Sequence, residues 1–203
     1  VAITTCTVAS GRSVPAVVID NDFEDRWDES VQPCENVDAL SAGDIASIAA
    51  RCGIVGMGGA AFPTNVKLDT SKLEEKPDTL IVNGSECEPY LTSDHRIMVE
   101  NAEQIVDGIA LAMKASGVAC AKVGIEDNKP DAIAAMREAA SGKQNIEVVS
   151  LPARYPQGFE KTLIYSLTGR IVPNGKLPSA AKCVVMNVGT CAALSEAVRK
   201  GQP

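Results

Sequence analysis

The chain has 203 residues, of which 45% are hydrophobic and 22% charged, a composition typical of a globular protein with its own core. Nineteen basic against 26 acidic side chains give a net charge of −7, which argues against a broad nucleic-acid-binding surface. The chain lacks an apolar run of about 18 residues, so we expect no transmembrane segment, and its first residues do not resemble a signal peptide.

The first elements predict the end of a β-rich domain. Residues 14–20 (VPAVVID) have the composition of a strand, and an acidic stretch that includes Asp25 and Trp27 follows them. We expect residues 1–38 to form the tail of a preceding barrel-sandwich-like domain and a solvated linker. The chain has no initiator Met, so we also expect it to be a piece of a longer protein.

From residue 39 to residue 203, the pattern alternates between strands and helices. Ser41 and Asp44 have the spacing of a helix N-cap, and Gly53 ends that helix. Strands are predicted at 79–83, 122–126, 146–151 and 183–188, and further helices at 92–116, 130–142, 158–169 and 190–201. This order predicts an α/β domain with a Rossmann-like, mostly parallel sheet and helices on both faces.

Three polar segments follow predicted strands, at residues 83–89, 152–160 and 187–190. Ligands of parallel α/β sheets bind outside the carboxyl ends of the strands. One sheet edge would therefore bring these distant segments together, and we expect a ligand site there.

A glycine-rich loop, GIVGMGGAAFPT, occupies residues 53–64. Gly56, Gly58 and Gly59 allow a ligand to approach the backbone, the freed N–H groups can surround a phosphate, and Lys67 adds a positive charge. The loop follows a helix and lacks the GK[ST] of a P-loop, so a tight turn that uses glycine only for geometry remains an alternative.

The loop at residues 83–89 (NGSECEP) directly follows a predicted buried strand. Its Asn, Ser and Glu side chains can hydrogen-bond a ribityl chain or a ribose. Two carboxylates would repel a phosphate, so they are better suited to hydroxyl groups or a heterocycle. An ordinary polar loop at a strand end is the alternative.

The seven cysteines are scattered and form no CxxC pair, which favours a reducing compartment and no metal site in this chain. His95, the only histidine, is expected at the surface.

Five motifs occur in order: GIVGMGGAAFPT with a Lys-Leu three residues on, NGSECEPYLT, IEDNKP, YPQGFEK and NVGT. Together they resemble the RnfC-type subunit of the Rnf electron-transport complex, from about residue 11 to the end. The pattern is more distantly similar to the FMN- and NADH-binding flavoprotein subunit of respiratory complex I.

The resemblance implies binding of FMN and NAD(H), with 4Fe–4S clusters in the parent protein outside this chain. Tyr155 and Glu160 would be the catalytic residues, beside the flavin ring and the nicotinamide. The cofactor-binding residues would be Gly56, Gly58, Gly59, Ala60, Phe62, Lys67, Asn83, Ser85, Glu86, Glu88, Tyr155, Gly158, Glu160 and Asn187. Phe159 departs from the family pattern, which usually has Gly there, and its ring could narrow the flavin pocket.

The function implied is that of a flavoprotein oxidoreductase subunit, inactive as a fragment, that passes electrons between NAD(H) and iron–sulfur clusters in ion-coupled transport. Its partners would be the other subunits of the complex, at the cytoplasmic face of the bacterial inner membrane. Two alternatives remain: a soluble NADH-dependent reductase subunit of the cobalamin or amino-acid reductase type, and a non-catalytic docking module.

Overall fold

The computed structural model describes residues 1–24 and 26–203, which divide into two compact units, 1–31 and 32–203. Asp25, one of the acidic residues of the predicted linker, lies outside the described residues. Within the described ranges, no helix is both long enough and apolar enough to cross a membrane. The expected domain boundary near residue 38 stays a prediction, although Val37 already packs in the core of the second unit.

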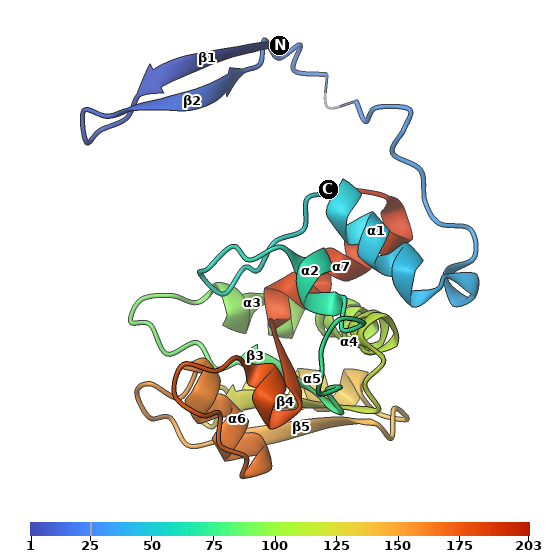
Figure 1. The fold of residues 1–203 in the computed structure, drawn as a ribbon, viewed down its shortest axis with the longest axis vertical. Coiled ribbons are helices and arrows are strands. Elements are labelled where there is room, and N and C mark those ends of the chain that lie inside the picture. Colours follow the sequence, from blue (N-terminus) through green and yellow to red (C-terminus); the bar gives the residue numbers. More distant parts are fainter. Residues whose placement is uncertain (25) are drawn as a thin grey trace. The chain divides into compact units, whose positions relative to one another are not determined.

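The first unit contains an antiparallel hairpin of β1 (Ala2–Thr7) and β2 (Ser13–Val18), whose register pairs residue 2 with 18 and residue 7 with 13 (Figure 1). We predicted only the second strand. The first strand is rich in Thr and Ile, which favour extended backbone, but it lacks the continuous apolar run that marks a buried strand. Every residue of β1 is exposed.

The second unit is built on a four-stranded parallel sheet in the order β5-β4-β3-β6. The strands are β3 (Thr79–Gly84), β4 (Cys120–Glu126), β5 (Ile146–Leu151) and β6 (Cys183–Asn187). The three apolar residues of β3 at 80–82 are completely buried, as expected for a central strand covered on both faces. The predicted α/β fold with a parallel sheet is therefore confirmed.

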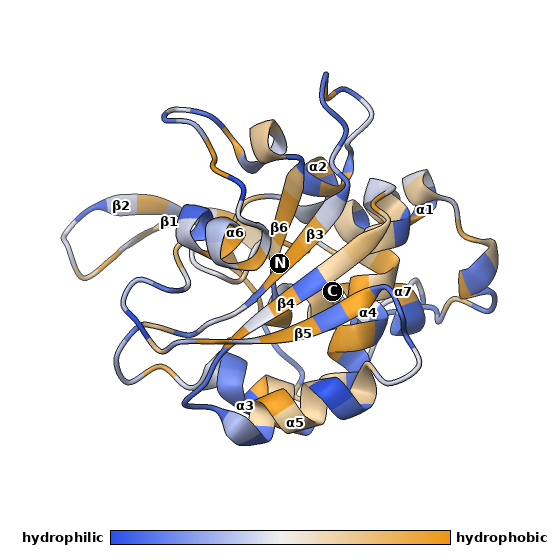
Figure 2. Ribbon diagram, turned by 90° about the horizontal axis from the view of Figure 1, so that it is seen from below, coloured by the Kyte–Doolittle hydropathy of each residue, from blue (hydrophilic) through white to orange (hydrophobic). Residues whose placement is uncertain are grey.

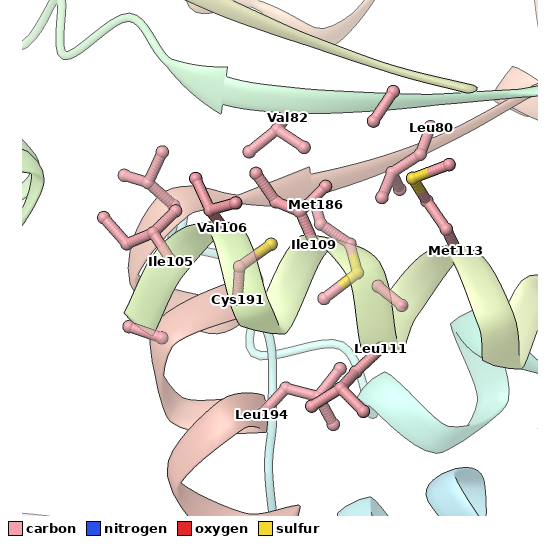
Figure 3. Packing of buried hydrophobic residues seen from close by; sticks show 14 of the residues in the cluster. Leu80, Val82, Ile105, Val106, Ile109, Leu111, Met113, Met186, Cys191 and Leu194 are labelled. Carbon is pink, nitrogen blue, oxygen red and sulfur yellow. The ribbon is translucent and has the colours of Figure 1, made fainter. Parts of the chain in front are cut away.

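Helices cover both faces of this sheet (Figures 1 and 2). On one face, Leu80 and Val82 of β3 and Met186 of β6 pack against α4 (Ala102–Ser116) and α7 (Val188–Lys200), as Figure 3 shows. The same core includes residues of α1 (Ala42–Arg51), α3 (Ser93–Glu100) and α5 (Pro130–Ala139). The opposite face packs Ile81 against α6 (Glu160–Thr168) and the short 3-10 helix Pro178–Ala181.

Two short helices complete the unit: a 3-10 turn at Val37–Ala39, and α2 (Thr64–Leu68), which directly follows the glycine-rich loop. α1 begins where the sequence predicts, because the Ser41 side chain accepts a hydrogen bond from the Asp44 N–H and the Asp44 carboxylate accepts one from the Ser41 N–H.

The predicted helix over residues 92–116 is two helices. Asn101, with φ −131°, ends α3 and precedes α4. The break lets α3 pack against α5 while α4 packs along α7, a division that periodicity alone does not reveal. The last helix begins at Val188 and not at Thr190, because the Asn187 side chain caps it by accepting from the N–H groups of Gly189 and Thr190.

The strand order creates a topological switch point. The chain passes from β3 to β4 and on to β5, and then returns to place β6 on the other side of β3. The connections that leave β3 and β6 therefore diverge, which opens a crevice between their carboxyl ends. Asn83 near the end of β3 and Asn187 at the end of β6 are partners in the strand register at this point.

Candidate functional site

A cavity of about 270 Å³ lies at the switch point between β3 and β6. It is lined by Gly56, Gly58, Ala60, Phe62, Thr64, Lys67, Asn83, Gly158, Phe159, Glu160, Val185, Met186, Asn187 and Thr190. The glycine-rich loop and the three strand-end segments that we expected to converge all contribute to this lining. Their residues span more than a hundred positions in sequence and meet only in the folded sheet.

The glycine-rich loop closes on itself and is fastened to α7. Its two ends meet where the Gly56 N–H donates to the Phe62 carbonyl at 2.8 Å. The Met57 N–H donates to Thr190 Oγ1 at 2.9 Å, which attaches the loop to the first turn of α7. Gly59 has a backbone φ of +116°, a conformation that residues other than glycine rarely adopt. The glycine-rich loop is therefore a tight turn that also forms part of the cavity wall.

Lys67 brings a positive charge to the cavity from α2. Its Nζ donates to the Val185 carbonyl of β6 at 2.9 Å and lies 5.9 Å from the centre of the Phe62 ring. Phe62, which is 46% exposed, also lines the cavity. The cation is therefore held in place and retains donors for a further anionic group, because an ammonium carries three N–H groups.

Asn83 joins the end of β3 to the segment that precedes α6. Its Nδ2 donates to the Gly158 carbonyl at 2.9 Å, and its Oδ1 accepts from the Ser85 N–H at 3.0 Å. Gly158 fits because it has no side chain: a Cβ there would lie 2.3 Å from the Ser85 carbonyl oxygen. This close approach joins the segment at the end of β3 to the segment before α6, and together they form one side of the cavity.

The beginnings of α6 and α7 both face the cavity. Phe159, the N-cap of α6, makes no side-chain capping bond, so the first N–H groups of that helix are open to a ligand. The amino end of a helix carries partial positive charge, which favours an anion. Glu160 in the first turn of α6 places a carboxylate at the same cavity, and Phe159, 53% exposed, lies beside it.

Five of the proposed residues do not line the cavity: Gly59, Ser85, Glu86, Glu88 and Tyr155. Ser85 is buried, and its Oγ donates to the Gly124 carbonyl. Tyr155 is 76% exposed and Glu88 is exposed as well. The YPQGFEK motif therefore reaches the cavity through Gly158, Phe159 and Glu160, while its tyrosine is not part of the cavity lining.

Glu86 has a structural partner that the sequence did not suggest. Its carboxylate accepts hydrogen bonds from the N–H groups of Asp94 and His95 and from the Ser93 hydroxyl. It therefore caps α3, where Thr92, the N-cap residue, makes no side-chain capping bond. The interpretation that the two loop carboxylates face hydroxyl groups or a heterocycle of a ligand stays a prediction.

Asp94 was not among the site residues predicted from the sequence. Its Oδ2 accepts a hydrogen bond of 2.7 Å from the Asn187 Nδ2, so it lies directly behind a cavity-lining side chain. Burial, reinforced by the nearby Glu86 carboxylate, raises the pKa of Asp94 to about 6. The only signal in the sequence is an acidic residue in the first turn of a helix, which usually indicates nothing more than a favourable helix dipole.

Lys129 and Glu126 form a buried ion pair beside this region. Lys129 Nζ lies 2.8 Å from Glu126 Oε2 and 3.5 Å from the Glu86 carbonyl. His95, whose side chain is 28% exposed, bonds Asp131 at 2.8 Å. Among the described residues, no group of three or more His, Cys, Asp or Glu side chains could hold a metal ion.

Comparison with known proteins identifies a matching family, similar sequences and similar structures. Residues 49–196 match the family model described as the Nuo51 FMN-binding domain. The chain is 50% identical over 188 residues to the C-designated subunit of the proton-translocating ferredoxin:NAD(+) oxidoreductase complex of Clostridium ljungdahlii, covering 93% of this chain and 41% of that protein. It is 48% identical over 195 residues to the Na(+)-translocating counterpart of Acetobacterium woodii, covering 96% and 44%.

Among solved structures, an NAD+-reducing [NiFe]-hydrogenase in the air-oxidized state matches with a TM-score of 0.66 and 25% identity, over 80% of this chain and 33% of that chain. The chain thus spans about two fifths of the length of the two curated relatives.

Proposed function

The chain belongs to the Nuo51 FMN-binding domain family, and from this premise we propose that it binds FMN in the cavity between β3 and β6. We propose further that it is the electron-input part of an Rnf-type complex and exchanges electrons with NAD(H). The observation that carries the proposal is the meeting of Lys67, Asn83, Gly158 and Asn187 at one cavity at the switch point of the sheet.

The residues of the cavity fit FMN. A phosphate requires positive charge and N–H donors, which the Lys67 ammonium group supplies. The ribityl hydroxyls and the ring require both donors and acceptors, which the side chains of Asn83, Asn187 and Thr190 offer. The cavity is slightly smaller than the about 300–1,000 Å³ of typical ligand sites, but it is partly open, so a ligand can extend beyond it.

Each group then has a role in binding or orientation. Lys67 neutralises the charge of the phosphate. Asn83 fixes the position of the segment before α6 through its hydrogen bond to the Gly158 carbonyl. The Glu160 carboxylate repels the phosphate, so it favours the orientation that turns the ring and sugar hydroxyls toward α6. Bound FMN would supply the chemistry of accepting a hydride and releasing electrons singly.

NAD(H) binding and the roles of the remaining residues are part of the same proposal. Tyr155 and Glu88 are exposed and outside the cavity, so any contact of theirs with a nucleotide requires a ligand that extends beyond the cavity. Phe62, exposed at the cavity, offers a ring face on which a base can stack.

The relatives are named as subunits of ion-translocating ferredoxin:NAD(+) oxidoreductase complexes. We therefore propose that the parent protein passes electrons to 4Fe–4S clusters outside this chain. We place it at the cytoplasmic face of the membrane, bound to the other subunits. The soluble reductase alternative shares the FMN site and differs only in these partners.

Flavin fluorescence titration tests the proposal. The Lys67→Met variant keeps the aliphatic stem but loses the charge, and we expect FMN affinity to fall about 10- to 100-fold, as for loss of one charged hydrogen bond. Lys200→Met is the matched control, because Lys200 pairs with Glu196 on α7 and does not line the cavity. Equal affinities in the two variants, or no FMN binding by the unaltered chain, would refute the proposal and favour the docking module.

A further inference from the structure

Asp94 occupies a distinctive position behind the cavity. It lies in the first turn of α3, is partly buried, and has no place in the cavity lining. Its Oδ2 accepts from the Asn187 Nδ2 at 2.7 Å, while the Asn187 Oδ1 accepts from the first N–H groups of α7. Asp94 therefore fixes which way the Asn187 amide faces, because the acceptor oxygen and the donor nitrogen each have a defined partner.

Asn187 in turn connects the carboxylate to the cavity. It lines the cavity at the end of β6, and it lies against the glycine-rich loop, since a Cβ on Gly58 would be 3.5 Å from the Asn187 Cβ. A Cβ on Gly189 would be 3.1 Å from the Asn187 Oδ1 and 3.9 Å from the Asp94 Oδ1. The carboxylate is thus separated from the cavity by a single side chain and by glycine backbone.

The charges around Asp94 come from several elements. The Glu86 carboxylate, from the loop after β3, accepts a hydrogen bond from the Asp94 N–H at 2.9 Å and repels a second negative charge. Lys129, before α5, opposes this effect, but it is already paired with Glu126. On α3 itself, His95 bonds Asp131 of α5. The first turn of α7 contributes no charged side chain.

A dianionic phosphate in the cavity would add negative charge to this setting. Two negative charges on either side of the Asn187 side chain repel each other, and the repulsion weakens as the distance between them grows. Asp94 can relieve that repulsion by binding a proton, because burial already disfavours its charged form. Its neutral carboxyl group retains an oxygen that accepts from Asn187.

We infer that Asp94 is a positioning residue of the flavin cavity, which orients Asn187 and takes up a proton from solvent when FMN binds. This inference rests on the proposed FMN site and adds two features to it: a second layer behind the cavity wall, and a dependence of FMN affinity on pH. Between about pH 6 and 8, affinity falls as pH rises, because binding then requires either a proton or repulsion between two anions.

Calorimetric titration with FMN measures both features. Repeating the titration in buffers of different ionisation enthalpy gives the number of protons taken up on binding. The FMN phosphate itself titrates near pH 6 and contributes to the proton uptake. The variant Asp94→Asn has no carboxyl group at this position, so its proton uptake measures the contribution of the phosphate, which is subtracted from that of the unaltered chain. We expect the unaltered chain to take up a substantial fraction of a proton more than Asp94→Asn at about pH 6.5.

The positioning role has its own comparison. Asp94→Asn keeps an oxygen acceptor for Asn187, whereas Asp94→Ala removes it. At pH 8 we expect about tenfold weaker FMN binding for Asp94→Ala than for Asp94→Asn, the value of roughly one hydrogen bond. Asp131→Ala, which removes an exposed carboxylate bonded only to His95 and its own helix, should bind as the unaltered chain does.

The outcomes separate the two proposals. Equal proton uptake by the unaltered chain and Asp94→Asn, with both binding FMN, overturns the inference and leaves the FMN site intact. Equal affinities of Asp94→Ala and Asp94→Asn overturn the positioning role. Should Asp94→Ala not fold, Asp94→Asn alone still measures the proton. A lack of FMN binding by the unaltered chain overturns the proposed function itself.

Discussion

The substitution Asp94→Asn should stabilise the protein at neutral pH. The folded state holds the Asp94 carboxyl where burial and the Glu86 carboxylate raise its pKa from 3.8 to about 6. A rise of that size corresponds to about 3 kcal/mol of lost stability when the group is ionised in both states. Asparagine has nearly the same shape and offers an oxygen to Asn187, but it carries no charge, so the variant avoids this cost.

The pH dependence gives the prediction its sign. Above about pH 6 the carboxyl is ionised in the folded and unfolded states, and the full cost is present. As pH falls from 6 toward 3.8, the folded state binds the proton first and the cost disappears. The gain from Asp94→Asn should therefore approach 3 kcal/mol above pH 7, an upper value because Asp94 is only partly buried, and vanish near pH 4.

Urea unfolding of the chain without ligand, at pH 4.5, 6 and 8, measures this difference. Asp131→Asn is the control, because the His95 bond lowers the pKa of that exposed carboxyl and no gain is expected. A gain that does not change with pH would refute the reasoning, since it would arise from packing or hydrogen bonding and not from charge. A loss of stability at pH 8 would show that the ionised carboxylate is favourable where it stands.

The remaining predictions concern packing and the buried ion pair. Gly108→Ala should cost about 3 kcal/mol, because its Cβ would lie 1.8 Å from a backbone oxygen of α7. Gly43→Ala on the exposed side of α1 should keep or raise stability, by up to about 1 kcal/mol, because alanine favours the helix more than glycine does. Thermal unfolding checks both variants, and equal effects would contradict the close crossing of α4 and α7. Lys129→Met should cost about 3–5 kcal/mol by leaving buried Glu126 unpaired. Lys122→Met, whose glutamate partner is exposed, should cost less than about 1 kcal/mol in the same urea titration; similar losses in these two variants would count against a desolvated pair.

The fold could be predicted largely because its signals are local. Apolar runs at 79–83 and 183–188 and the cap at Ser41 each specify an element with little help from tertiary contacts. The division at Asn101 could not be predicted, since the apolar stripe continues across it and only the packing of α3 on α5 requires the break. The start of α7 was missed because Thr190 is also a good capping residue, and the choice of Asn187 depends on where β6 ends.

The candidate site shows the same division between local and tertiary information. The carboxyl-end rule predicted that residues 83–89, 152–160 and 187–190 converge, and segments of all three line or support one cavity. The orientation of individual side chains was less predictable. The Glu86 carboxylate caps α3, a helix whose own N-cap residue makes no side-chain capping bond, and this contact forms only in the folded chain. Asp94 could not be predicted because its contact with the site is a hydrogen bond to a residue 93 positions away.

A structure of the chain with bound FMN tests the central claim most directly. We expect FMN between β3 and β6, with its phosphate within hydrogen-bond distance of Lys67 Nζ. FMN bound at any other surface, with the switch-point cavity empty, would contradict the claim.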